Sequence, residues 1–159
     1  DVGMNFEKWS FFLCMVVSLK ICVFQKKKSN KCRFFVGTLW CGAGNISSSE
    51  DDVGIFMYTD ACCRGHDKCP SNIDAGDTKG DLINNGIFTR SACSCDSKFY
   101  HCLKNASSPI ADNLGTTYFN LLRPQCFEEN YPIKDCKCVK YNFDKSQKKR
   151  LIWVDNPDF

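Results

Sequence analysis

The sequence has 159 residues, a length that suits one domain with a buried core of its own. Apolar residues make up 43% of it, which excludes a disordered chain, and the net charge of +3 is too small to indicate a nucleic acid partner. Thirteen cysteines are typical of a disulfide-rich protein from an oxidising compartment. Because thirteen is odd, at least one cysteine is free, joined to another molecule or removed by processing.

The beginning of the chain has the layout of a secretory signal peptide. After Met4, a candidate for the true initiator, a short start with one lysine precedes the apolar run from Trp9 to Val17. Ser18 suits a signal peptidase, so we expect residues 1–18 to be the signal peptide. The run is shorter than the roughly 20 apolar residues that cross a membrane. A transmembrane helix and a buried core helix are the alternatives.

The next segment, residues 19–33, is polar and basic and is typical of a pro-segment, with Arg33 as a candidate processing site. The mature protein would then be one domain, residues 34–159. Cleavage after Arg33 leaves ten cysteines, an even set, and changes the net charge to −2. We therefore expect a secreted, extracellular monomer whose contact with membranes depends on apolar groups more than on positive charge.

The spacing of four cysteines predicts two helices. Cys62 and Cys69 are seven residues apart, as are Cys95 and Cys102, so each pair falls on one helical face. In antiparallel helices, pairing Cys62 with Cys102 and Cys69 with Cys95 gives one consistent register. We expect two such helices joined by two disulfides, each of which contributes roughly 2 to 4 kcal/mol to stability.

A histidine lies between the two cysteines of the first helix. In the antiparallel register residue 98 faces His66, and Asp96 is only two residues from that position. A histidine beside a carboxylate on a rigid scaffold is the arrangement of a base with its orienting partner. A surface histidine is the alternative, and it is the interpretation that we adopt for His101. Asp67 points about 100° away from His66 and can serve another purpose.

The segment from Trp40 to Asn45 indicates what that purpose is. Its alternating glycines, Gly42 and Gly44, let a loop curl its carbonyl oxygens inward. Calcium binds several such oxygens together with carboxylates. A simple turn is the usual alternative for so short a pattern, but a cysteine in this loop makes a link to the helix that bears Asp67. We therefore expect a calcium site that is completed by Asp67.

These motifs belong to an ordered set of segments: Gly37–Asn45, Thr59–Cys69, Cys93–Asp96, Lys98–Asn105 and Tyr118–Leu121. Together they resemble the group III secreted phospholipases A2, typified by bee venom phospholipase, from about Phe34 to Cys126. The resemblance implies a mainly α, disulfide-rich phospholipase A2 fold with a small β-hairpin, two antiparallel crosslinked helices and an N-terminal calcium loop.

The resemblance also implies an activity, the hydrolysis of the sn-2 ester of phosphoglycerides to a free fatty acid and a lysophospholipid. His66 would activate water, Asp96 would orient His66, and Tyr118 would support Asp96 by a hydrogen bond. One calcium ion would stabilise the oxyanion, with an added hydrogen bond from the backbone N–H of Gly42. The implied calcium ligands are the carbonyl oxygens of Trp40, Gly42 and Gly44 and the carboxylate of Asp67.

Four disulfides are implied as well: Cys41–Cys63, Cys62–Cys102, Cys69–Cys95 and Cys93–Cys126. Two of them are the pairs that the helical register favours. After Cys126 the chain departs from the family pattern, because Cys136 and Cys138 are separated by one residue. A disulfide between these two would be strained, and Cys32 is another candidate partner if the pro-segment stays attached.

Several features lie outside this core pattern. Sequons at Asn45 and Asn105 predict N-glycosylation on a secretory route. Alternating apolar residues at 139–143, followed by an apolar run at 151–154, predict a terminal β-hairpin. Our candidates for contact with a phospholipid membrane or micelle are Phe34, Phe35, Val36, Ile87 and Phe88, with packing on the helices as the alternative.

Two other functions are alternatives to an enzyme. A catalytically silent receptor ligand or toxin would share the scaffold, although such proteins typically lose the histidine or the aspartate that this chain retains. A zinc module would use Cys62, Cys63, His66 and Cys69. Adjacent cysteines fit tetrahedral zinc poorly, and secretion favours their oxidation.

Overall fold

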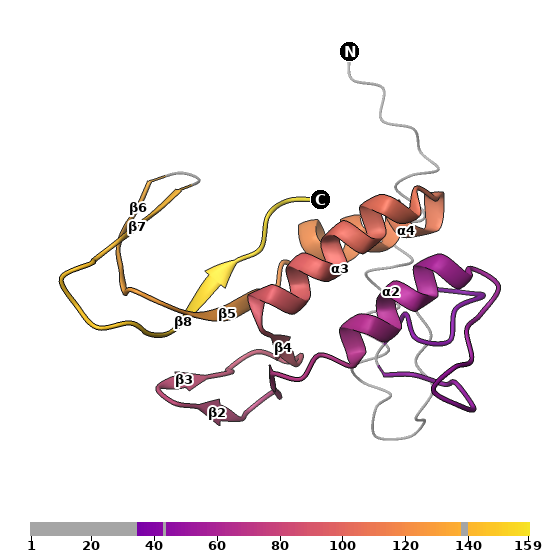
Figure 1. Cartoon of the computed structure of the whole chain (residues 1–159), viewed down its shortest axis with the longest axis horizontal. Coiled ribbons are helices and arrows are strands. Elements are labelled where there is room, and N and C mark those ends of the chain that lie inside the picture. The colour runs from indigo at the N-terminus through magenta and orange to yellow at the C-terminus, as the bar shows by residue number, and fades with distance from the viewer. Residues whose placement is uncertain (1–34, 43, 138–139) are drawn as a thin grey trace, which may run out of the picture. The chain divides into compact units, whose positions relative to one another are not determined.

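A computed structural model describes residues 35–42, 44–137 and 140–159 of the chain (Figure 1). The chain divides into two compact units: an N-terminal unit that ends at Arg64 and a C-terminal unit that begins at Gly65. The predicted signal peptide and pro-segment lie outside the described residues.

The described helices and strands are, in chain order, α2 (Met57–Asp67), β1 (Asn72–Ile73), β2 (Thr78–Lys79), β3 (Leu82–Ile83), β4 (Arg90–Ser91), α3 (Cys93–Ala106), α4 (Pro109–Gly115), η1 (Thr116–Leu122), β5 (Gln125–Asn130), β6 (Ile133–Lys137), β7 (Lys140–Phe143) and β8 (Arg150–Asp155).

Both helices that the cysteine spacing predicts are present. Cys62 and His66 lie in α2, whereas Cys95 and Asp96 lie in the first turn of α3. Cys69 follows the end of α2, where its backbone N–H donates to the carbonyl oxygen of His66 at 3.0 Å. Among the described residues, no helix has the length and apolar character needed to span a membrane. The predicted combination of disulfide-linked helices and a little antiparallel β-structure is confirmed.

A further helical stretch, which the sequence analysis did not predict, follows α3. The Ser108 hydroxyl accepts a hydrogen bond from the backbone N–H of Ala111, and Pro109 occupies the first turn, so α4 begins with two favourable start signals. The π-helix η1 continues directly from α4 and ends before Arg123, whose φ of 45° is left-handed. α4 packs beside α3 (Figure 1). This stretch supplies Tyr118 to the site described below.

The described strands form four antiparallel pairs: β1 with β4, β2 with β3, β5 with β8, and β6 with β7. The predicted terminal hairpin is therefore wrong in its pairing. Both segments are strands, but β7 pairs with β6, from which two residues separate it, and β8 pairs with β5 over six residues. The short connection between β6 and β7 favours a hairpin of these two strands. β8 instead pairs with β5 and contributes to the apolar core beside Phe127.

Two apolar groups stabilise the C-terminal unit. Ile73, Leu82 and Phe127 are buried together, and the Trp153 ring meets the Phe127 ring edge-on. A second group is aromatic and centres on Phe119, which is 1% exposed and lies between α3 and the end of the chain. Burial of side chains of this size contributes roughly 1.5 to 3 kcal/mol each.

Candidate active site

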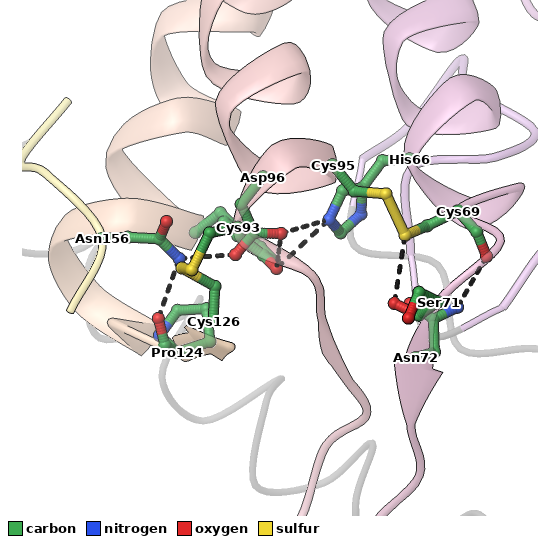
Figure 2. A network of polar contacts seen from close by, with 11 residues as sticks. His66, Cys69, Ser71, Asn72, Cys93, Cys95, Asp96, Pro124, Cys126 and Asn156 are labelled. Carbon is green, nitrogen blue, oxygen red and sulfur yellow. Dashed lines mark hydrogen bonds and ion pairs between the residues drawn. A yellow bond between two sulfur atoms is a disulfide. The ribbon is translucent and has the colours of Figure 1, made fainter. Parts of the chain in front are cut away.

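The predicted base and its partner are in direct contact. His66 Nε2 lies 2.7 Å from Asp96 Oδ1, so the last turn of α2 meets the first turn of α3 (Figure 2). The side chain of His66 is 13% exposed, whereas that of Asp96 is fully buried. In a neutral imidazole, donation from Nε2 leaves Nδ1 as the acceptor nitrogen. The pair therefore presents a basic nitrogen on a partly accessible ring.

Aromatic rings fix the orientation of the imidazole. The ring of Phe99 is stacked on His66 with 4.5 Å between centroids and 23° between planes. Tyr118 meets His66 edge-on, at 5.3 Å. Phe99 lies one turn after Asp96 on α3, so one helix supplies both the carboxylate and the stacking ring. The His66 ring is therefore held in place by packing against these rings as well as by its hydrogen bond to Asp96.

Tyr118 also bonds to the carboxylate. Its hydroxyl donates to Asp96 Oδ1 at 3.2 Å and lies 3.4 Å from His66 Nε2. Burial raises the pKa of Tyr118 well above its usual value, and the negative charge of Asp96 adds to this effect. The phenol therefore stays protonated and remains a donor at any physiological pH.

Asn156 is a partner of Asp96 that the sequence analysis missed. Its side-chain amide donates to Asp96 Oδ2 and also to the carbonyl oxygen of Pro124, the latter at 2.9 Å. Figure 2 shows Asn156 and His66 on opposite sides of the Asp96 carboxylate. Asn156 and Asp96 are 60 positions apart in the chain, and no motif or spacing connects them. Both oxygens of this buried carboxylate thus have donors.

Disulfides anchor the helix turn that carries Asp96. Cys95 is bonded to Cys69, just after α2, and Cys93 is bonded to Cys126 in β5. In the N-terminal unit Cys41 is bonded to Cys63. These are three of the four bonds that the resemblance implies.

The remaining cysteines bear on the alternatives. Cys62 and Cys102 are each disulfide-bonded. Because Cys62, Cys63 and Cys69 are all oxidised, the zinc module is wrong: a disulfide sulfur is not the thiolate that zinc requires. Cys138 lies outside the described residues, so its predicted pairing is not tested.

The glycine-rich loop of the N-terminal unit is organised by a second buried carboxylate, Asp60, which the sequence analysis also missed. Asp60 accepts hydrogen bonds from the backbone N–H groups of Trp40 at 2.8 Å, Leu39 at 2.9 Å and Gly54 at 2.7 Å. Asp60 is 0% exposed. A charge buried to this degree is stable only when donors surround it, so these contacts fix the path of the loop.

The implied calcium ligands are hard oxygen donors, which is the chemistry that calcium prefers. Gly42 and Gly44 are exposed in the N-terminal unit, and Asp67 is exposed in the C-terminal unit at the end of α2. Gly44 has a φ of +93°, which strongly favours glycine. No group of three or more His, Cys, Asp or Glu that could hold a metal exists among the described residues. The donor chemistry of the implied ligands fits calcium.

One detail of the loop differs from expectation. The backbone N–H of Gly42, which the resemblance implies as an oxyanion donor, donates instead to the carbonyl oxygen of Trp40 at 3.1 Å. A local turn thus occupies this donor, and we assign it no role in the reaction.

The candidate lipid-contact residues divide into two groups. Val36 is 85% exposed and Ile87 is 67% exposed, whereas Phe35 is buried, with 6% of its surface exposed. Phe88 is intermediate, and Phe34 lies outside the described residues. Both sequon asparagines, Asn45 and Asn105, are exposed. The predicted surface residue His101 is also exposed.

The described structure is a small, disulfide-linked helical protein that holds a histidine on a buried aspartate. Comparison with known proteins shows the class to which it belongs, the phospholipases A2. The sequence model of the phospholipase A2 family matches residues 34–130, and the chain belongs to that family. The predicted resemblance to the group III enzymes is confirmed.

Relatives named phospholipase A2 cover most of the chain. The protein of Apis dorsata is 45% identical over 128 residues, which are 76% of this chain and 96% of that protein. The protein of Bombus pensylvanicus is 42% identical over 130 residues, with the same coverage. The group 3 secretory phospholipase A2 of Homo sapiens is 41% identical over 91 residues, which are 57% of this chain and 18% of that protein.

Proposed function

We propose that this protein is a secreted, calcium-dependent phospholipase A2 that hydrolyses the sn-2 ester of phosphoglycerides and acts as a monomer. The observation that carries the proposal is the contact between His66 and the buried carboxylate of Asp96. Family membership supports it, since the matched relatives are named for this activity.

The chemistry follows from the ring orientation. Because Nε2 of His66 donates to Asp96, Nδ1 accepts a proton from a water molecule, whose oxygen attacks the ester carbonyl carbon. The proton then passes to the glycerol oxygen as the carbon–oxygen bond of the ester breaks. A free fatty acid and a lysophospholipid leave. Asp96 holds the required tautomer and stabilises the imidazolium, and Tyr118 supports Asp96 by its hydrogen bond.

The ligand set that we propose for calcium consists of the Trp40, Gly42 and Gly44 carbonyl oxygens and the Asp67 carboxylate. When bound, the ion supplies positive charge to the substrate phosphate and to the oxygen that becomes negative during attack. The hydrogen bonds that Asp60 accepts from the backbone N–H groups of Leu39 and Trp40 support this assignment, because they hold the loop backbone from which three of these ligands come.

Exposed apolar residues support contact with an aggregated lipid surface. In the N-terminal unit four consecutive residues, Ile55–Tyr58, are exposed in addition to Val36, and in the C-terminal unit Ile87 is exposed. Contiguous exposed apolar side chains mark interaction sites on otherwise polar surfaces. We propose that these residues touch a phospholipid membrane or micelle.

Secretion and glycosylation are parts of the same proposal. Disulfides persist mainly in oxidising compartments, which is consistent with a secreted protein. The exposure of Asn45 and Asn105 would leave both sequons open to the glycosylation machinery.

The proposal is tested by fatty acid release from phosphatidylcholine in mixed micelles with calcium present. We expect turnover by the purified protein, its loss on addition of a chelator, and a fall in kcat of about 10² to 10⁴-fold for His66→Gln. His101→Gln is the matched control, since His101 is exposed on α3, and it should retain full activity. Turnover that survives both the chelator and His66→Gln would contradict the proposal. No turnover by a folded, calcium-loaded protein would favour a catalytically silent ligand instead.

A further inference from the structure

We propose that Asn156 is a positioning residue for the reaction: its side-chain amide holds the second oxygen of the Asp96 carboxylate, so that the first oxygen stays on the His66 ring. This inference rests on the proposed function of the His66–Asp96 pair. It adds a member to the site that lies outside the segment matched by the family model, residues 34–130.

The orientation of the Asn156 amide is determined by its neighbours. Its nitrogen faces two acceptors, the Asp96 carboxylate and the carbonyl oxygen of Pro124, and neither can donate. The NH₂ group must therefore point at both, with one hydrogen for each. The same side chain thus ties the carboxylate to the backbone that leads into β5.

Burial makes this donor important. Asp96 is 0% exposed, so bulk water does not reach Oδ2 in place of Asn156. The terminal torsion of an aspartate is broad, so a carboxylate with donors on one oxygen only is free to turn about that torsion. Such a turn moves Oδ1 away from Nε2 and loosens the His66 ring. A donor on each oxygen removes that freedom.

Asn156 is itself held on both sides. Before it, β8 pairs with β5 through Asp155 opposite Gln125. After it, Asn120 donates from its amide to the Phe159 carbonyl at 3.1 Å and accepts from the Phe159 N–H at 2.6 Å. These two hydrogen bonds fix the end of the segment Asn156–Phe159 against η1, the helix that also carries Tyr118.

The ring of Phe159 completes the anchor. It stacks parallel to Phe119 at 5.9 Å between centroids and lies 3.7 Å beneath the ammonium of Lys104. It also fills the space beside Gly115, where an added Cβ would lie 2.4 Å from the ring. The Asn156–Phe159 segment is therefore packed into the aromatic group of the C-terminal unit, and its position defines that of the Asn156 amide.

The main test is Asn156→Leu, which keeps the branched shape of the side chain and removes both N–H donors. We expect kcat to fall by about 10 to 100-fold, because a small displacement of a catalytic group has an effect of this size, with KM and calcium affinity within about twofold of the original. The downfield ¹H NMR signal of the His66 Nε2–H, which reports its hydrogen bond to Asp96, should broaden or shift upfield. Partial recovery of kcat in Asn156→Gln, which restores a donor, is also expected.

The matched control is Gln125→Leu. Gln125 is likewise an amide, and it donates to Asp155 at 2.9 Å, so its loss loosens the neighbouring residue without removing the donor to Asp96. We expect its kcat and its histidine signal to be unchanged. The inference would be overturned if Asn156→Leu lowered only the melting temperature and left kcat and the histidine signal unchanged. Asn156 would then contribute to stability alone.

Two further outcomes are separable. If Asn156→Leu does not fold, Asn156→Val is measured instead, because valine is smaller than leucine and also lacks a donor. A kcat equal to that of the original protein in this variant overturns the inference, whereas a reduced kcat supports it. The NMR signal does not need turnover. A protein without activity therefore contradicts the proposed function alone, and the response of the histidine signal to Asn156→Leu still decides the positioning role.

Discussion

Two aspartates of this chain, Asp60 in the N-terminal unit and Asp96 in the C-terminal unit, are both 0% exposed. They differ in the kind of group that surrounds them. Asp60 accepts from the backbone N–H groups of Leu39, Trp40 and Gly54. Asp96 accepts hydrogen bonds from side chains, and these bonds orient the side chains that donate them.

This difference separates two uses of a buried carboxylate. A carboxylate that bonds to backbone N–H groups determines where the main chain runs, and so it builds a loop. The Asp96 carboxylate bonds to the side chains of His66, Tyr118 and Asn156. It therefore orients side chains and does not determine the path of the backbone. We therefore expect the two sites to respond differently to the same substitution, aspartate to asparagine.

The largest expected effect is the loss of activity in Asp96→Asn. The amide would present either a donor or a weaker acceptor to Nε2, which disturbs the tautomer of His66, so kcat should fall by about two to four orders of magnitude. Steady-state kinetics on mixed micelles measures this, and Asp81→Asn at an exposed site is the control. A kcat within a few-fold of the original would show that Asp96 does not orient the base.

Asp60→Asn should affect folding first. One amide oxygen cannot serve three backbone donors, and its NH₂ group would face an N–H, so we expect the free energy of unfolding to fall by about 3 kcal/mol. Urea unfolding measures this, and isothermal titration at a temperature where the variant is folded should show weaker calcium binding. Asp51→Asn, at an exposed position in the same unit, is the control. If Asp60→Asn left the free energy of unfolding unchanged and reduced kcat, Asp60 would act in the reaction and not in building the loop.

The sequence predicted one of these sites and missed the other for a physical reason. Cys62, His66 and Asp96 follow helical periodicity, so simple register arithmetic brings the base and its partner together. Asp60 is a single acidic residue next to Thr59, and its role depends on where a distant loop passes. Asn156 reaches Asp96 only because β8 pairs with β5, whereas local rules favoured a hairpin with the preceding strand.

A smaller effect is expected for lipid binding, which can be compared between the two units. Val36→Asp and Ile87→Asp each replace one exposed apolar side chain, one per unit, with a charge. If a side chain is partly inserted in lipid, its loss should weaken binding to phosphatidylcholine vesicles by about 1 kcal/mol, or about fivefold. Vesicle sedimentation measures this, and Ser97→Asp on the exposed surface of α3 is the control. If only one of the two variants binds more weakly, that unit carries the contact.

The smallest expected effect concerns Tyr118 at alkaline pH. Its pKa is raised in the folded protein, first by burial and then by the charge of Asp96. Above about pH 10 the unfolded chain loses the phenol proton while the folded chain keeps it, so the unfolded state binds fewer protons and stability falls as pH rises. Below that pH the phenol is protonated in both states, so stability does not change with pH through Tyr118.

Tyr118→Phe removes this titration, and its stability should therefore fall less steeply above pH 10, by at most about 1.4 kcal/mol per pH unit relative to the original protein. Urea midpoints measured for both proteins at several alkaline pH values test this, and their difference cancels effects shared by other tyrosines and by the disulfides. Parallel curves above pH 10 would mean that Tyr118 titrates normally. In that case its hydroxyl would not be held against the charge of Asp96, and the orienting site would have one member fewer.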